Sequence, residues 1–151
     1  MCDQYIADIL GKVKTIALVG ASEKIDRPSY KVMEYLLNQG YKVIPVSPKL
    51  AGQTLLNQPV MEQLSDIEQS VDMIDVFRNV DAAYGVAEEA IAIGAKVLWL
   101  QKGIINEEAK LLAEKAGLDV VMDRCPKIEI QRLGIEKQIR RQLFLFTTLL
   151  L

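Results

Sequence analysis

Short apolar runs alternate along this chain with segments of helical periodicity, and this alternation constrains the fold more than any other feature. The runs are nearly continuous in Val, Ile and Leu, which is typical of parallel strands covered on both faces. They occupy residues 15–19, 42–46, 71–77, 96–100 and 118–122. We therefore predict an α/β fold with a doubly wound, mainly parallel five-stranded sheet and helices on both faces.

Helical patterns fill three of the intervals between the runs, and each pattern ends at a glycine, a common helix terminator. The apolar positions and their glycines are Tyr30, Met33, Leu36 and Leu37 before Gly40; Ala83, Val86, Ala87, Ala90 and Ile91 before Gly94; and Leu111, Leu112 and Ala116 before Gly117. Asn106 is a predicted N-cap. A closing helix is predicted over residues 128–143, and residues 50–70 suggest a short edge element and one helical turn at 60–64.

Composition limits the classes of function. The 151 residues are 50% hydrophobic and 25% charged, which predicts a single domain with a core at about 13–133, followed by a C-terminal helix and an apolar tail at 134–151. The net charge of −2 does not favour a nucleic-acid partner. The absence of histidine excludes Ser-His or Cys-His nucleophile pairs and His-ligated metals, so we expect binding rather than catalysis.

The two ends of the chain carry further expectations. The N-terminus lacks the basic start and apolar run of a secretory signal, so we expect a cytoplasmic protein. Residues 143–151 are apolar except for two threonines and are too short to span a bilayer, which needs about 20 residues. We expect this tail to pack on the sheet or on a partner subunit, as in a homodimer; contact with a membrane is the disfavoured alternative.

The glycine turn after the first run is the first candidate site. Ligands of wound sheets lie beyond the carboxyl ends of the strands, near the point where the strand order reverses. Gly20, Ala21 and Ser22 stand there before a predicted helix. Glycine allows close backbone approach, serine can donate its hydroxyl, and a helix N-terminus attracts phosphate. With one early glycine, the turn is not the G-x-G-x-x-G dinucleotide fingerprint, and a plain strand-to-helix turn is the alternative.

A basic residue follows the second run, where dinucleotide-binding folds place an acid that holds the ribose diol. No Asp or Glu occurs between residues 41 and 53, and Pro48 and Lys49 stand there instead. A lysine suits a phosphate on the ribose rather than a free diol. The alternative is a solvent-exposed loop lysine.

Other candidate site residues follow the remaining runs. Arg78 can meet a phosphate, and the ring of Phe77 can flank a base. Gln101 offers a donor and an acceptor to an amide-rich ligand, and Gly103 allows close approach. Arg27 precedes the first long helix, near the expected position of a pyrophosphate.

Two further residues stand out beside this site. Asp75 lies inside an apolar run and would be costly to bury unpaired, so we predict an ion pair with Arg78 or Arg124. Cys125 is the only candidate nucleophile near the strand ends. Without a histidine to deprotonate it, its thiol is expected to be structural or redox-sensitive rather than catalytic.

Several of these segments, taken together, carry a family resemblance. Ile-Ala-Leu-Val-Gly-Ala-Ser, Arg-Pro-Ser-Tyr, Val-Ser-Pro-Lys, Val-Phe-Arg and Met-Asp-Arg-Cys-Pro occur in this order. The pattern, over about residues 13–133, resembles the small stand-alone CoA-binding proteins, whose fold is similar to the N-terminal CoA-binding domain of the succinyl-CoA synthetase α subunit. The resemblance implies a Rossmann-like domain that binds coenzyme A or an acyl-CoA along the strand ends.

The resemblance also implies roles for particular residues. It assigns the pyrophosphate loop to 20–22, a phosphate contact to Lys49 and pantetheine-side contacts to the region of Gln101. Arg27, Pro48, Phe77 and Arg78 match the family's motifs without an assigned role. The larger synthetases use a phosphorylated histidine in a ligase domain, so this histidine-free chain is not expected to run that reaction by itself.

Three interpretations of the function remain open at this point. The first is non-catalytic binding of CoA or an acyl-CoA, with a metabolic enzyme as a possible partner. The second is an NADP-dependent oxidoreductase, because a 2′-phosphate would suit Lys49 nearly as well. The third is an interaction protein with a vestigial nucleotide cleft. A narrower hypothesis is that Cys125 forms a mixed disulfide with the CoA thiol.

Overall fold

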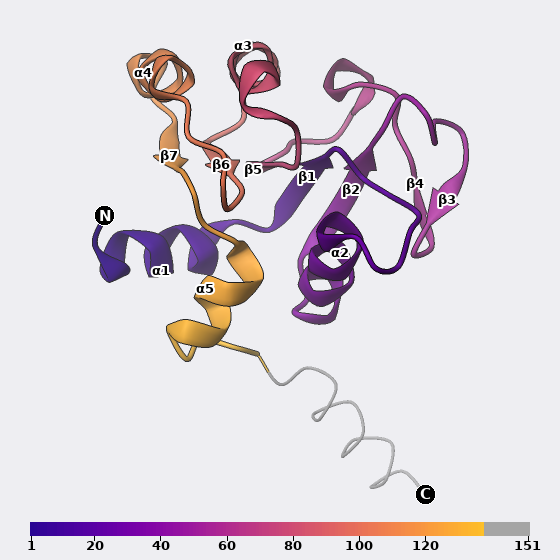
Figure 1. The fold of residues 1–151 in the computed structure, drawn as a ribbon, viewed down its shortest axis with the longest axis horizontal. Coiled ribbons are helices and arrows are strands. Elements are labelled where there is room, and N and C mark those ends of the chain that lie inside the picture. The colour runs from indigo at the N-terminus through magenta and orange to yellow at the C-terminus, as the bar shows by residue number, and fades with distance from the viewer. Residues whose placement is uncertain (138–151) are drawn as a thin grey trace, which may run out of the picture.

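A five-stranded parallel sheet forms the middle layer of the computed structural model, which describes residues 1–137 (Figure 1). Its strands are β1 (Thr15–Val19), β2 (Lys42–Val46), β5 (Met73–Val76), β6 (Val97–Leu100) and β7 (Asp119–Val121). They lie in the order β2-β1-β5-β6-β7, so the order reverses between β1 and β5. The predicted α/β fold with a doubly wound sheet is confirmed, and the later strands are slightly shorter than their apolar runs.

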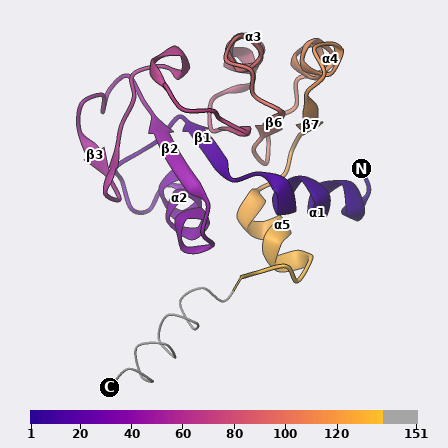
Figure 2. The same cartoon turned by 180° about the vertical axis from the view of Figure 1, so that it is seen from behind.

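Helices cover both faces of the sheet. They are α1 (Asp3–Lys12), α2 (Pro28–Asn38), α3 (Ala83–Ala92), α4 (Glu107–Lys115) and α5 (Pro126–Arg132), with short 3-10 turns η1 (Leu64–Asp66) and η2 (Val80–Ala82). Figures 1 and 2 show α3 and α4 on one face and α1, α2 and α5 on the other. Alternate strand residues supply two cores: Ile16 and Leu18 face the second group of helices, and Ala17 and Val19 face the first.

The predicted helix boundaries are confirmed for the three long intervals. Gly40, Gly94 and Gly117 follow α2, α3 and α4 with positive φ angles of 94°, 77° and 92°, a conformation that glycine adopts readily. The side chain of Asn106 accepts a hydrogen bond of 2.9 Å from the N–H of Ala109 and caps α4.

Helix α1 was not predicted from the sequence. Its apolar side, formed by Ile6, Ile9 and Leu10, is almost fully buried against the sheet and α5. The phenol of Tyr5 donates to the carbonyl of Val120 (3.2 Å) and accepts from its N–H (3.0 Å). Helix α1 is thereby joined to the edge strand β7.

Where a short edge element was predicted within residues 50–70, the chain forms a small hairpin beside the sheet. Its strands, β3 (Thr54–Leu55) and β4 (Gln58–Pro59), pair antiparallel. Leu56 and Asn57 between them both have positive φ angles, 48° and 64°, the pattern of a tight two-residue hairpin turn. Met61 then pairs with Val46 of β2, so the helical turn predicted at 60–64 is wrong and the 3-10 turn begins only at Leu64.

The predicted closing helix is also too long. Helix α5 ends at Arg132, and Gly134 adopts a positive φ of 68° that stops the helix. Residues 133–137 are not helical, and residues 138–143 of the predicted helix, together with the apolar tail at 143–151, lie outside the described residues. Among residues 1–137, no helix has the length and apolar character that a bilayer crossing requires.

Candidate functional site

Two neighbouring cavities open at the carboxyl ends of β1, β2 and β5, where the strand order reverses. The first has a volume of about 360 Å³ and lies between the 20–24 loop, the start of α2 and the segment after β2. The second, of about 450 Å³, lies on the side of α3. Gly20, Ala21, Ser47 and Lys49 line both cavities. Cavities of this size and position are typical of ligand sites in open α/β sheets.

The glycine at the end of β1 is required by its contact with β5. Gly20 has a φ of 93°, and a Cβ atom there would lie 2.3 Å from the carbonyl oxygen of Phe77. The N–H groups of Gly20 and Ala21 both donate to the carbonyl of Val46 (3.1 and 3.2 Å). Gly20 therefore holds three strand ends together, and its own N–H faces β2 rather than the first cavity.

Donors for an anion come from the residues after this turn. In the part of the chain that the structure describes, the N–H groups of Ser22 and Ser29 have no protein acceptor. Ser22 Oγ accepts from the N–H of Lys24 (3.1 Å) and keeps its proton for another acceptor. Helix α2 starts with Pro28 at its first position, and its N-terminal end lies at the first cavity. A helix N-terminus in this position favours a phosphate.

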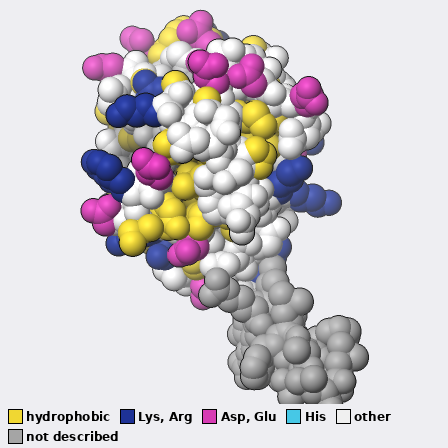
Figure 3. Space-filling model, turned by 90° about the vertical axis from the view of Figure 1, so that its right-hand side faces the viewer, with side chains coloured by type: hydrophobic (Ala, Val, Ile, Leu, Met, Phe, Trp, Pro, Cys, Tyr) yellow, Lys and Arg dark blue, Asp and Glu magenta, His cyan; other side chains and the backbone are white. Residues whose placement is uncertain are grey.

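Charge distinguishes the two cavities. The first is lined by Lys24, Arg27 and Lys49 against the single carboxylate of Glu23. The second has two cations, Lys49 and Arg78, and two carboxylates that balance them, Glu62 and Glu89. Figure 3 shows side chains of both signs on the hairpin side of the molecule. The positive charge of the first cavity is therefore a local feature of its lining.

The structure brings most of the predicted site residues together. Ser22, Arg27 and Phe77 line the first cavity, and Pro48 and Arg78 line the second. Lys24, Ser29 and Ser47 also line the first cavity and were not predicted as site residues, although all three lie in the strand-end segments or adjoin them.

Gln101 and Gly103 line neither cavity and lie farther along the sheet edge. Gly103 has a φ of 89°, and its N–H donates to the carboxylate of Asp123 (2.7 Å), which ties the loop after β6 to the loop after β7. Gln101 is 6% exposed, and its Oε1 has no hydrogen-bond partner. A buried acceptor without a partner is uncommon in folded proteins and calls for an explanation.

The predicted ion pair of Asp75 is wrong. Asp75 lies between Leu18 and Trp99 in the middle of the sheet, fully buried, and neither carboxylate oxygen has a partner. Arg124 pairs instead with Glu129, at 2.6 Å, and Arg78 lines the second cavity. Burial raises the pKa of Asp75 well above its ordinary value, so the carboxyl group is neutral in the folded protein at pH values where it ionises in the unfolded chain.

Replacing Asp75 by asparagine should flatten the pH dependence of stability. Above the pKa of the unfolded chain and below the raised pKa of the folded protein, only the folded state keeps the proton, so the free energy of unfolding falls as pH rises. The Asp75→Asn variant should lack this slope. Its free energy of unfolding, taken relative to that of the wild type, should therefore rise by about 1 kcal/mol or more between pH 5 and pH 8. Urea unfolding between pH 5 and pH 8 measures this difference, with Asp66→Asn at an exposed position as the control. An unchanged slope in the Asp75→Asn variant would contradict the prediction.

The strand order, the tight turn after β1 and the helix that follows it define a Rossmann-like α/β protein. Residues 14–131 match the family model described as the CoA binding domain. The chain belongs to this family, which confirms the resemblance found in the sequence.

Several known proteins are similar to this chain in sequence, and two of them also in solved structure. An uncharacterized protein of Bacillus subtilis (strain 168), YneT, is 37% identical over 123 residues, which cover 82% of this chain and 90% of that protein. The solved structure of cell-free ID.343 from Thermus thermophilus is 38% identical, has a TM-score of 0.84 and covers 88% of this chain and 99% of its own. A hypothetical protein from Pyrococcus horikoshii OT3 is 40% identical, with a TM-score of 0.84 and coverages of 88% and 92%.

Proposed function

We propose that this protein binds coenzyme A or an acyl-CoA without catalysing a reaction on it, and that the phosphate groups lie in the first cavity. The observation that carries the proposal is the lining of that cavity. Three cationic side chains and one carboxylate line it, beside the N-terminus of α2 and the N–H groups of Ser22 and Ser29 that have no protein acceptor among residues 1–137. Charge-assisted hydrogen bonds of this kind are the strongest available for a pyrophosphate.

The neighbouring second cavity suits the adenine ring. Val19, Leu64 and Val86 supply apolar lining, and the charges of that cavity balance. Lys49 lines both cavities. With the base in one cavity and the pyrophosphate in the other, Lys49 lies between them, where the 3′-phosphate of the ribose would be.

The acyl or thiol end of the ligand is proposed to run along the sheet edge away from α2. Phe77 and Gln101 follow β5 and β6, the next two strands in that direction. The unpartnered Oε1 of Gln101 can accept a hydrogen bond from an amide N–H, and the pantetheine arm carries two amides. The residues present thus fit each part of CoA.

A binding role is favoured over catalysis by the groups that surround these cavities. The chain has no histidine, and the buried carboxyl group of Asp75 lines neither cavity. When CoA is bound, its thiol can carry an acyl group; the residues named here bind and orient the molecule. We propose that the protein acts as a carrier or sensor of CoA.

Replacing Lys49 by alanine tests the proposal. Hydrogen bonds to charged groups contribute about 1.5–3 kcal/mol, so the variant should bind CoA roughly 10- to 100-fold more weakly by calorimetry. Binding of 3′-dephospho-CoA should change little, because that ligand lacks the phosphate in question. Lys31→Ala, an exposed lysine of α2 outside both cavities, is the matched control.

Other outcomes would contradict the proposal in different ways. An equal loss of affinity for CoA and 3′-dephospho-CoA would remove the proposed role of Lys49. Tight binding of NADP with no response to CoA would favour the oxidoreductase interpretation. Absence of binding by CoA, NADP and other adenine nucleotides at micromolar concentration would favour an interaction protein.

A further inference from the structure

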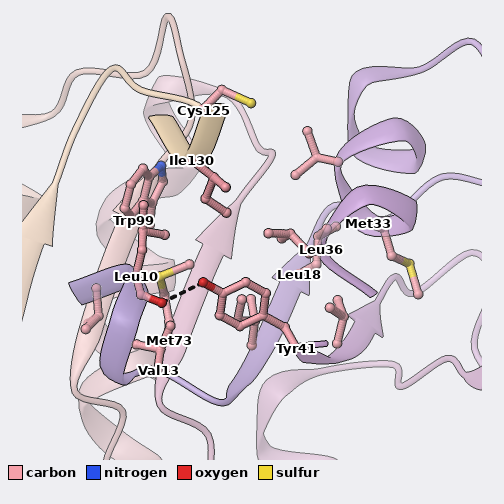
Figure 4. Packing of buried hydrophobic residues seen from close by; sticks show 14 of the residues in the cluster. Leu10, Val13, Leu18, Met33, Leu36, Tyr41, Met73, Trp99, Cys125 and Ile130 are labelled. Atoms are coloured by element: carbon pink, nitrogen blue, oxygen red, sulfur yellow. Dashed lines mark hydrogen bonds between the residues drawn. The ribbon is translucent and has the colours of Figure 1, made fainter. Parts of the chain in front are cut away.

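Cys125 lies at the carboxyl edge of the sheet, on the face covered by α5. It precedes Pro126, the first residue of α5, and is 8% exposed. The indole N–H of Trp99 on β6 donates to the carbonyl of Arg124 (2.7 Å) and so fixes the loop between β7 and α5 that carries Cys125. Figure 4 shows Cys125 at the margin of the core cluster, beyond Ile130, with its sulfur directed away from Trp99. In the part of the chain that the structure describes, Cys125 forms no disulfide.

The unpartnered oxygen of Gln101 lies at the same carboxyl edge of the sheet. The N–H of Gln101 donates to the carbonyl of Val76 (3.3 Å), which continues the pairing of β6 with β5 by one residue. Side chains alternate along a strand, so Gln101 shares the face of Trp99, toward α5 and Cys125. Gln101 is 94% buried, and its Oε1 lacks a donor. This independent observation points to a ligand with an N–H group beside the thiol.

The distance from the phosphate site to Cys125 matches the length of the pantetheine arm. From β1, where the turn of the first cavity lies, the edge crosses β5 and β6 to reach β7. Three strand steps of about 4.8 Å span roughly 14 Å. About 13 bonds join the pyrophosphate of CoA to its sulfur, and an extended chain advances about 3.5 Å per three bonds, which gives roughly 15 Å. An extended pantetheine arm anchored at the first cavity is therefore long enough to reach the end of the sheet that carries Cys125.

We infer that Cys125 is a site of reversible mixed-disulfide formation with CoA, an inference that rests on the proposed function. The Cys125 thiolate attacks one sulfur of CoA disulfide, and a new bond forms between Cys125 Sγ and that sulfur. The disulfide bond of the reagent breaks, and the second CoA leaves as a thiolate that takes up the proton lost by Cys125. The exchange requires no other oxidant. Gln101 holds an amide of the arm and orients the sulfur toward Cys125.

Competition between two disulfides tests this inference on the full chain. The protein is incubated separately with CoA disulfide and with glutathione disulfide at equal concentration, and adducts at each cysteine are followed by peptide mass spectrometry. Binding through the nucleotide raises the effective concentration of the reacting sulfur. We expect CoA disulfide to modify Cys125 at least about 10-fold faster than glutathione disulfide does. The exposed Cys2 should show no such preference and is the internal control.

Two further arms separate failure of this inference from failure of the proposed function. Adenosine 3′,5′-bisphosphate, which has no thiol, should slow the reaction of Cys125 with CoA disulfide and leave Cys2 unaffected. The Cys125→Ser variant should still bind reduced CoA in calorimetry. If it binds CoA while wild-type Cys125 shows the same preference between disulfides as Cys2, only the mixed-disulfide inference is overturned. If neither protein binds CoA, the proposed function is overturned as well.

Discussion

The Gly20→Ala variant is expected to lose about 2–5 kcal/mol of stability. The residue has a positive φ of 93°, which costs an L-residue roughly 1–2 kcal/mol. Its new Cβ would also lie 2.3 Å from the backbone oxygen of Phe77, and such overpacking adds about 1–3 kcal/mol. Because the contact is with backbone, β1 and β5 must move apart at their carboxyl ends, which also opens the first cavity.

Variants at two other glycines separate the cost of a positive φ angle from the cost of the steric contact with Phe77. Gly52 has a φ of 85° and open space around the position of a Cβ, so Gly52→Ala should show the backbone cost alone. Gly85, inside α3 with ordinary φ and open space, should gain about 0.5–1 kcal/mol as alanine. Urea unfolding of the three variants gives the comparison. A Gly20→Ala variant no less stable than Gly52→Ala would show that the contact with Phe77 relaxes freely.

The Glu129→Ala variant is expected to lose about 1.5–3 kcal/mol, the usual contribution of hydrogen bonds to a charged group, because its two arginine partners are partly exposed. Glu129 is 3% exposed. It accepts from Arg124 and from Arg132, each at 2.6 Å, and Arg132 also binds Asp3 of α1. The carboxylate therefore joins α5 to α1 and to the loop that carries Cys125. Removing it leaves two guanidinium groups without their shared acceptor.

The same carboxylate predicts how stability changes in acid. Burial alone would raise the pKa of Glu129, but hydrogen bonds from Arg124 and Arg132 outweigh burial and hold that pKa below its ordinary value. Its contribution is present above the pKa of the unfolded chain and is lost as pH falls through the lower pKa of the folded protein. The wild type should thus lose its advantage over Glu129→Ala at low pH, as acid and urea unfolding can measure. Asp3→Asn changes an exposed partner of Arg132 and should cost much less than Glu129→Ala; a similar loss in both variants would contradict the prediction.

The fold was largely predictable because strand and helix patterns in this chain are separate and regular. Helix α1 was missed although Ile6, Ile9, Leu10 and Val13 recur at helical spacing and are buried. It precedes the first strand, where the alternation of runs and helices gives no expectation. Leu111 was counted among the apolar positions of the predicted helix before Gly117 but is 57% exposed. The close packing of α3 against α4 is made by small residues, and the inward positions of α4 are Ala109 and Ala113.

The site was predictable only where it depends on strand ends. Residues that follow β1, β2 and β5 converge because parallel strands end at one edge. The second cavity is also lined by Gln63 and Leu64 from the segment after the hairpin and by Val86 from α3. These elements reach the cavity through tertiary packing, which no local pattern in the sequence specifies. Asp75 illustrates the same limit: its charge suggested a partner, whereas its position between Leu18 and Trp99 excludes one.

The phenol of Tyr5 has a consequence for self-association. An edge strand whose N–H and carbonyl groups are free can recruit a strand from another molecule and start aggregation. Tyr5 occupies both groups of Val120 on β7, and at the opposite edge Met61 exchanges hydrogen bonds with Pro45 and Ser47 around β2. Both borders of the sheet are thus closed to intermolecular strand addition at these positions.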